Sequence, residues 1–208
     1  MAFTLTQFYS TRPYLYHLTS PRNLDLLLET RLMRSTAQLL HSSGDGKWKG
    51  TKRPQTITVN VDGRLVDLRD QQPLYDGNTS LQGGWGFEDL IRALNDFVFF
   101  WPGWASGPID YGTRHFERYE TDGPIIMRVS TRELFDANGA EPYFCKYNSG
   151  SPRTTQGASS PRGPDTFVRC NQASYTASNV VEVVFKDVAT LPAIVESSTS
   201  PFGPWTQH

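Results

Sequence analysis

The stretch "YLYHLTSPRNLDLLLETRLM", residues 14–33, joins an apolar, strand-like run to a leucine-rich segment through one turn. Residues 14–17 are typical of a buried strand, which ends on a histidine. Ser20 followed by Pro21 predicts a helix start, because serine caps free backbone N–H groups and proline is tolerated in a first helical turn. The polar residues gathered around this turn, His17 above all, need partners from elsewhere in the chain.

Further strand and helix signals alternate along the sequence. Alternating residues on either side of Asp62-Gly63 predict a hairpin, because this dipeptide favours the backbone of a tight two-residue turn. Strands are expected at residues 97–101, 124–129, 142–147 and 179–187, and helices at 35–40, 86–96 and 130–139. Residues 148–166 are expected to form a long surface loop. The pattern predicts one α+β domain over residues 1–196, followed by a mobile tail at 197–208.

Composition and charge narrow the possible functions only slightly, because a locally basic face would be hidden in the net charge. The 208 residues carry a formal net charge of −1, which gives no global electrostatic case for nucleic-acid binding. The two cysteines are too few for a disulfide scaffold, and no cluster has metal-ligand spacing, so no metal is expected. No apolar run approaches the roughly 18 residues needed to cross a bilayer, and no signal-peptide pattern is present. We therefore expect a cytoplasmic protein.

Two polar residues inside apolar runs are candidates for function. Glu182 lies in "VVEVVF", where it either faces water on alternate strand positions or is a buried carboxylate, which requires a partner or a chemical role. His17 is either a structural histidine at a strand end or a ligand-binding one. The residues alone leave both questions open.

Four blocks in the same order resemble DarT-type ADP-ribosyltransferases. The first is the "YHLT" strand end followed by Asn-Leu and a short helix. The others are "DFVFFWPGWASGP", "GPIIMRVSTRELFDANG" and "VVEVVFKDVATLPAIV", and the last of them aligns Glu182 with the catalytic glutamate of that family. The resemblance implies an ADP-ribosyltransferase-like split β-sheet with short flanking helices and NAD as co-substrate. The hairpin and residues 148–166 depart from the family pattern.

The resemblance also implies roles for single residues. His17 would bond the ribose next to adenine, and backbone groups near Leu18 would hold the nicotinamide amide. Thr19 and Asn23 would help to seat the dinucleotide. Glu182 would stabilise an oxocarbenium-like transition state and accept the proton of the nucleophile.

The family also places an arginine near the NAD phosphates and the reacting group. Arg69 is our candidate for a catalytic role, although it could instead be a surface partner of Asp67 or Asp70. Arg64 and Arg53 are the fallback candidates. In the aromatic strand, alternate residues would face the cleft, and the candidates for a ring that stacks on nicotinamide are Phe99, Phe100 and Trp101.

The acceptor of ADP-ribose is the remaining question. DarT-type enzymes modify bases in single-stranded DNA, and residues 148–169 precede the catalytic strand, where this superfamily places substrate-recognition loops. Arg153, Arg162 and Arg169 could contact phosphate there, and Phe167 could stack on a base, unless the loop is simply solvated. The alternatives are an NAD glycohydrolase, in which water is the acceptor, and a non-catalytic binding module. An RNA 2′-phosphotransferase is disfavoured, because this sequence has no set of basic residues that matches the phosphate site of such an enzyme.

Overall fold

The computed structural model describes residues 2–139, 142–152, 154–155 and 158–208. The helices are α1 (Leu5–Thr11), α2 (Pro21–Thr30), α3 (Thr36–Ser42), α4 (Phe87–Asn95), α5 (Asp110–Tyr119) and α6 (Thr131–Asn138). The first strands are β1 (Tyr14–Thr19), β2 (Leu32–Arg34), β3 (Ile57–Val61), β4 (Arg64–Leu68), β5 (Ser80–Leu81), β6 (Phe97–Trp104), β7 (Gly107–Pro108) and β8 (Ile125–Ser130). The later strands are β9 (Tyr143–Cys145), β10 (Thr154–Thr155), β11 (Ala158–Ser159), β12 (Pro161–Arg162), β13 (Glu182–Lys186), β14 (Val188–Thr190), β15 (Glu196–Ser198) and β16 (Thr206–Gln207). Short 3₁₀ turns lie at Asp76–Asn78, Glu120–Asp122, Pro164–Thr166, Cys170–Gln172 and Ala177–Asn179.

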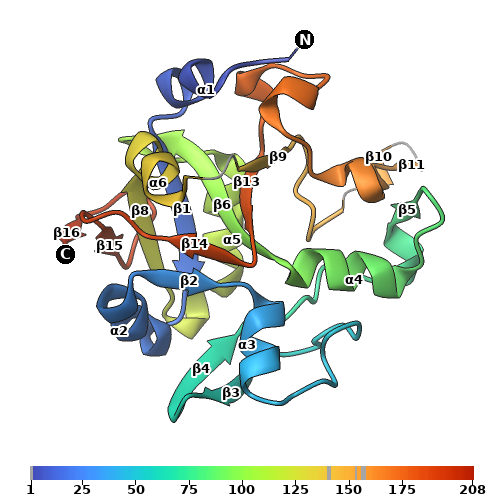
Figure 1. The fold of residues 1–208 in the computed structure, drawn as a ribbon, viewed down its shortest axis with the longest axis horizontal. Coiled ribbons are helices and arrows are strands. Elements are labelled where there is room, and N and C mark those ends of the chain that lie inside the picture. The colour runs from blue at the N-terminus through green and yellow to red at the C-terminus, as the bar shows by residue number, and fades with distance from the viewer. Residues whose placement is uncertain (1, 140–141, 153, 156–157) are drawn as a thin grey trace.

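A large antiparallel sheet forms the centre of the molecule (Figure 1). Its strand order is β16-β15-β8-β1-β6-β13-β9, and β7 pairs with the end of β6. Short helices pack around this sheet, so the predicted α+β class is confirmed. Among the described residues, no helix has the length and apolar character required to cross a membrane.

Strand β6 changes its pairing partner along its length. Its second half pairs with β1, ending at the pair Tyr16↔Trp101, and its first half pairs with β13, starting at Val183↔Phe100. Beyond Tyr16, β1 continues in register with β8, and in the described residues the strand end at His17–Thr19 has no backbone pairing with β6. Strands β1 and β6 therefore separate next to the histidine.

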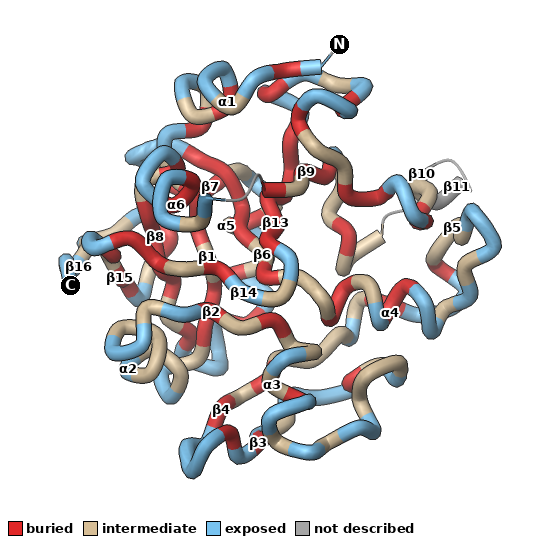
Figure 2. The backbone as a smooth tube through the Cα atoms, in the orientation of Figure 1, coloured by how far each residue is buried: buried red, intermediate tan, exposed pale blue. Residues whose placement is uncertain are grey.

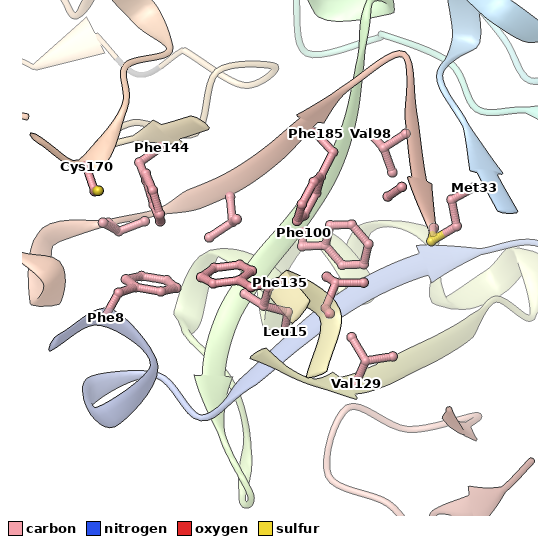
Figure 3. Packing of buried hydrophobic residues seen from close by; sticks show 14 of the residues in the cluster. Phe8, Leu15, Met33, Val98, Phe100, Val129, Phe135, Phe144, Cys170 and Phe185 are labelled. Carbon is pink, nitrogen blue, oxygen red and sulfur yellow. The ribbon is translucent and has the colours of Figure 1, made fainter. Parts of the chain in front are cut away.

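The main core lies on one face of the sheet. Figure 3 shows the aromatic rings of Phe8, Phe144, Phe135, Phe185 and Phe100 packed in a continuous row. Neighbouring ring centroids are 5.0 Å apart for Phe8–Phe144 and 5.9 Å apart for Phe100–Phe185, in edge-to-face geometry, which the aromatic quadrupole favours. Figure 2 shows burial concentrated along the central strands. Helices α1 and α6 contribute to this core.

The other face of the sheet is covered by two separate clusters. Leu90, Ile91 and Leu94 of α4 pack there with Val184, and Phe116 of α5 packs in a second cluster with Trp101 and Tyr16. Because these clusters are distinct, α4 and α5 lie over different parts of the sheet.

The predicted hairpin forms at β3 and β4. Asp62 and Gly63 both have positive φ, 54° and 83°, as the predicted tight turn requires. Its inner side chains pack with Leu40 of α3 as a small cluster of their own. Asn23 joins the hairpin to α2, because its side chain donates to the Asp67 carbonyl and accepts from the Asp67 N–H, both at 2.9 Å.

The prediction of a mobile tail at 197–208 was wrong. Strand β15 pairs with β8, and β16 pairs with β15, so the C-terminal segment extends the main sheet. The Arg128 guanidinium donates to both carboxylate oxygens of Glu196, at 2.7 and 2.9 Å, and stacks on Trp205. These contacts fix a segment whose own sequence has no strand-like alternation.

Candidate functional site

A cleft of about 870 Å³ opens where β1 and β6 separate. Its wall is built from the end of β1, the first half of β6, the hairpin strand β4, helix α5 and the turn at residues 148–151. Small-molecule sites commonly have volumes of this size. Of the residues proposed from the sequence, the cleft brings together His17, Leu18, Thr19, Asn23, Arg69, Phe99, Trp101 and Glu182.

His17 is held at the cleft by a backbone contact. Its Nδ1 lies 2.8 Å from the carbonyl oxygen of Phe99, which can only accept, so the Nδ1 atom carries the proton. Burial lowers the pKa of His17 to about 4, the bond to Phe99 opposes this change, and the charge of Arg69 adds to it. At neutral pH the imidazole is therefore uncharged, and Nε2 is left as a hydrogen-bond acceptor.

Glu182 is the first residue of β13 and does not face water. Its side chain is 3% exposed, and its Oε1 accepts the Ser149 N–H at 3.0 Å. Its Oε2 is buried and has no hydrogen-bond partner among the described residues. Burial raises the pKa of Glu182 to about 7, while Ser149 and the charge of Arg162 act in the opposite direction. The carboxyl group can thus exchange a proton near neutral pH.

Arg69 points into the cleft from the end of β4. Its guanidinium lies 4.2 Å from the centre of the Tyr119 ring, and a carboxylate oxygen of Asp122 lies 3.9 Å from its Nη1. No ion pair with Asp67 or Asp70, the expected surface partners, is present in the described structure. Burial lowers the pKa of Arg69, and the arginine remains a cation at neutral pH.

An aromatic stack lines the cleft beside Arg69. The Trp101 ring lies 4.5 Å from His115, which lies 5.0 Å from Tyr119. Burial, together with the charges of Arg69 and Arg118, lowers the pKa of His115 to about 3, so this histidine is neutral. The Tyr119 hydroxyl donates to Asp70 at 2.9 Å, which anchors α5 to the end of β4.

Sequence reasoning missed His115 and Tyr119. They lie on α5, in "DYGTRHFERY", a segment with few apolar residues and a glycine, and no helix was predicted there. The signal that could have found them is their spacing, because residues four apart share one face of a helix.

The other proposed residues at the cleft play smaller parts. Thr19 is 4% exposed, and Leu18 is packed in the cluster of α5. Asn23 lines the cleft, but both of its amide atoms are occupied by Asp67, so its observed role is to hold the hairpin. The Phe99 ring packs edge-on against Phe167. Trp101 is mostly buried, and its indole N–H has no partner among the described residues.

The two fallback arginines do not replace Arg69. Arg53 is buried and uses its guanidinium to bond the Arg69 carbonyl and the Asn95 side chain, at 2.9 Å each. Arg64 forms an exposed ion pair with Glu29 outside the cleft. Arg53 therefore supports the wall of the cleft.

The loop expected to contact nucleic acid is partly internal. Arg162 is 1% exposed, and its guanidinium bonds backbone carbonyls, so the expectation of a solvent-facing arginine was wrong. Phe167 is buried against Phe97, at 4.7 Å between ring centres, and is not available to stack on a base. Arg169 is partly buried over the Tyr143 ring, at 3.7 Å. Arg153 lies outside the described residues.

The donor set of the cleft does not resemble a metal site. In the described part of the chain, no group of three or more His, Cys, Asp or Glu side chains is placed to hold a metal ion. Cys145 pairs across the sheet with Glu182, but its thiol is buried, and burial raises its pKa. The titratable groups that define the site are accordingly Glu182, His17 and His115.

Residues 13–195 match a family of unknown function, DUF7002. The match covers most of the chain and includes every strand that lines the cleft. The chain belongs to this family. The family description assigns no activity, and no curated protein and no solved structure matches the chain.

Proposed function

We propose that this DUF7002 protein is an NAD-dependent ADP-ribosyltransferase and that Glu182 is its catalytic residue. The observation that carries the proposal is that His17 and Glu182, from the two strands on either side of β6, line one cleft at the point where β1 leaves β6. The partner change in β6 is the feature expected of a split sheet. The four ordered sequence blocks that resemble DarT-type enzymes give the same pair of residues.

The chemistry of the cleft suits a dinucleotide. A neutral His17 offers Nε2 as an acceptor for a ribose hydroxyl. Arg69 supplies a fixed positive charge for a phosphate, and its stacking on Tyr119 restricts its motion. Trp101 and His115 provide flat surfaces that suit a planar base.

Glu182 would act at the bond between nicotinamide and ribose. As that C–N bond breaks, its electron pair goes to the nicotinamide ring nitrogen, and positive charge develops on the ribose. The ionised Glu182 carboxylate stabilises that charge. A lone pair of the acceptor then forms the new bond to C1′, and the acceptor proton passes to the free Oε2 of Glu182.

The acceptor class is a further part of the proposal. The resemblance favours a base in single-stranded DNA, but Arg162 and Phe167 are not surface residues and lend this acceptor no support. Arg118 extends over the cleft side of α5 and contacts the Ser151 hydroxyl at 3.5 Å, so cationic groups do lie at the cleft. We therefore include nucleic acids as the first acceptors to test.

The test is to follow both halves of labelled NAD. The protein would be incubated with NAD and, separately, single-stranded DNA, RNA, a protein mixture or buffer alone, and nicotinamide release and label transfer would be measured. The expected result is nicotinamide release by the parent, and transfer of ADP-ribose with one acceptor class. Glu182→Gln should lose this activity, and Glu117→Gln, which removes an exposed charge on α5, should retain it.

The alternatives give different results in the same assay. Release that needs no acceptor and yields free ADP-ribose would identify an NAD glycohydrolase. Tight NAD binding without release under any condition would identify a binding module. Equal activity in the Glu182→Gln variant and its parent would refute the assigned catalytic residue.

A further inference from the structure

In the described part of the chain, one backbone N–H is hydrogen-bonded to the carboxylate of Glu182. Its Oε1 accepts the Ser149 N–H at 3.0 Å, and Oε2 has no partner among the described residues. Ser149 is fully buried, and its hydroxyl also lies close enough to lower the pKa of Glu182. The position of the Ser149 peptide nitrogen therefore controls where the carboxylate points.

Arg162 holds the peptide that contains this nitrogen. The peptide unit joins the Asn148 carbonyl to the Ser149 N–H, and Arg162 Nη2 donates to the Asn148 oxygen at 2.7 Å. Arg162 Nε donates to the next carbonyl, that of Ser149, at 3.2 Å. A continuous chain of hydrogen bonds thus runs from the guanidinium through the peptide unit to Glu182.

The same guanidinium is fixed from its other side. Its Nη1 donates to the Ser160 carbonyl at 3.1 Å, to the Ser160 hydroxyl at 2.9 Å and to the Pro161 carbonyl at 3.1 Å. Its flat face lies over the Tyr147 ring, at 4.9 Å. The side chain is 1% exposed, and no carboxylate forms an ion pair with it among the described residues. Five carbonyl and hydroxyl contacts at fixed angles require the planar fork of an arginine, which lysine does not have.

The chain has an electrostatic as well as a geometric effect. A donor on a peptide oxygen polarises the peptide and strengthens the bond that its N–H makes. The buried positive charge also favours a negative charge on the nearby carboxylate. Both effects lower the pKa of Glu182 and so oppose the rise that burial causes.

We propose that Arg162 is a positioning residue for Glu182, which acts through the Asn148–Ser149 peptide to aim the carboxylate into the cleft and to keep it ionised for catalysis. The proposal rests on the proposed function for its catalytic meaning. Its structural half, the coupling between Arg162 and the protonation of Glu182, is independent of what the cleft binds.

Arg162→Lys is the direct test, with nicotinamide release measured across pH. Without the polarised peptide, Glu182 should require a higher pH to ionise, so the midpoint of the kcat profile should rise by roughly one unit, about tenfold in rate on the acid side. The KM for NAD should change by less than about threefold, because Arg162 does not touch the cleft contents. Arg128→Lys, which alters another buried arginine that does not line the cleft, should reduce stability and leave the midpoint in place.

A second readout does not depend on activity. The pKa of Glu182 can be measured from the pH dependence of the difference in unfolding free energy between the Glu182→Gln variant and its parent, with and without Arg162→Lys. A pKa that rises in the Arg162→Lys protein supports the coupling even if no protein cleaves NAD, in which case only the proposed function fails. An unchanged pKa or pH midpoint would overturn the positioning role. If Arg162→Lys does not fold, Ser160→Ala, which removes one acceptor of Arg162, should give a smaller shift in the same direction, and no shift would again overturn it.

Discussion

Replacement of Glu182 by glutamine should stabilise the protein while removing its activity. The pKa of Glu182 is raised from 4.5 to about 7 by burial, so the fold favours the protonated acid. Below about pH 4.5 the carboxyl is protonated in both the folded and the unfolded chain, and ionisation costs no stability. Between about pH 4.5 and 7 the unfolded chain ionises first, and stability falls with rising pH.

The size of the effect follows from the shift. A change of about 2.5 pKa units at about 1.4 kcal/mol per unit is roughly 3 kcal/mol. Glutamine has nearly the same shape, can keep its oxygen on the Ser149 N–H, and has no charge to desolvate. The Glu182→Gln variant should therefore match its parent near pH 4.5 and exceed it by roughly 3 kcal/mol above pH 7.

Urea unfolding at a series of pH values measures this difference, with Glu117→Gln as the control for loss of an exposed charge. The activity of the Glu182→Gln variant should be lower than that of its parent by about 100-fold or more, which is the contribution of one well-placed acid or base. A stability difference that is flat across pH would mean that the Glu182 carboxyl ionises normally in the folded protein, and the assigned burial effect would then be wrong.

Three further predictions follow from the cleft and the sheet. His17→Ala should weaken NAD binding by about tenfold, equally between about pH 6 and 9, because an imidazole with a pKa of about 4 is neutral throughout; a loss that varies with pH in calorimetry would contradict this. Arg69→Lys should raise the KM for NAD about tenfold, because an ammonium neither stacks on Tyr119 nor forms a planar fork; steady-state kinetics with an unchanged KM would exclude a phosphate contact. Glu196→Gln should lower the free energy of unfolding by roughly 3 kcal/mol, since it leaves the buried Arg128 without its partner, and should leave NAD binding unchanged; urea unfolding equal to that of the parent would remove the role assigned to this pair.

Local patterns in the sequence predicted much of the central fold. The hairpin was predicted correctly because Asp62-Gly63 encodes its turn and the flanking residues alternate. Strand β1 and helix α2 were predicted from one apolar run and a serine-proline helix start. Each of these signals arises within a few residues, so neighbouring sequence is sufficient to read it.

The elements that were missed depend on distant partners. Strand β15 has the sequence Glu-Ser-Ser, and it is held by pairing with β8 and by the ion pair to Arg128, neither of which leaves a local pattern. Helix α5 buries only a narrow face and carries charges on the rest. Arg162 was taken for a surface residue because its neighbours are small and polar, and its burial depends on carbonyls 13 and 14 residues earlier in the chain.

The candidate site shows the same division. His17 and Glu182 stood out because each is polar inside an apolar run, and the structure brings both to one cleft. Whether Glu182 faced water could not be decided from alternation, because β13 is buried on both faces and its pattern has no outward side. The stack of Trp101, His115 and Tyr119 arises only when α5 folds onto the sheet.

NAD should bind in the cleft with its reacting ribose beside Glu182. A crystal structure of the protein with a non-hydrolysable NAD analogue would show where the dinucleotide lies. We expect a ribose hydroxyl on His17 Nε2, a phosphate near Arg69, and the bond between nicotinamide and ribose next to Glu182 Oε2. An analogue bound outside this cleft, or bound in it with the nicotinamide end away from Glu182, would contradict this expectation.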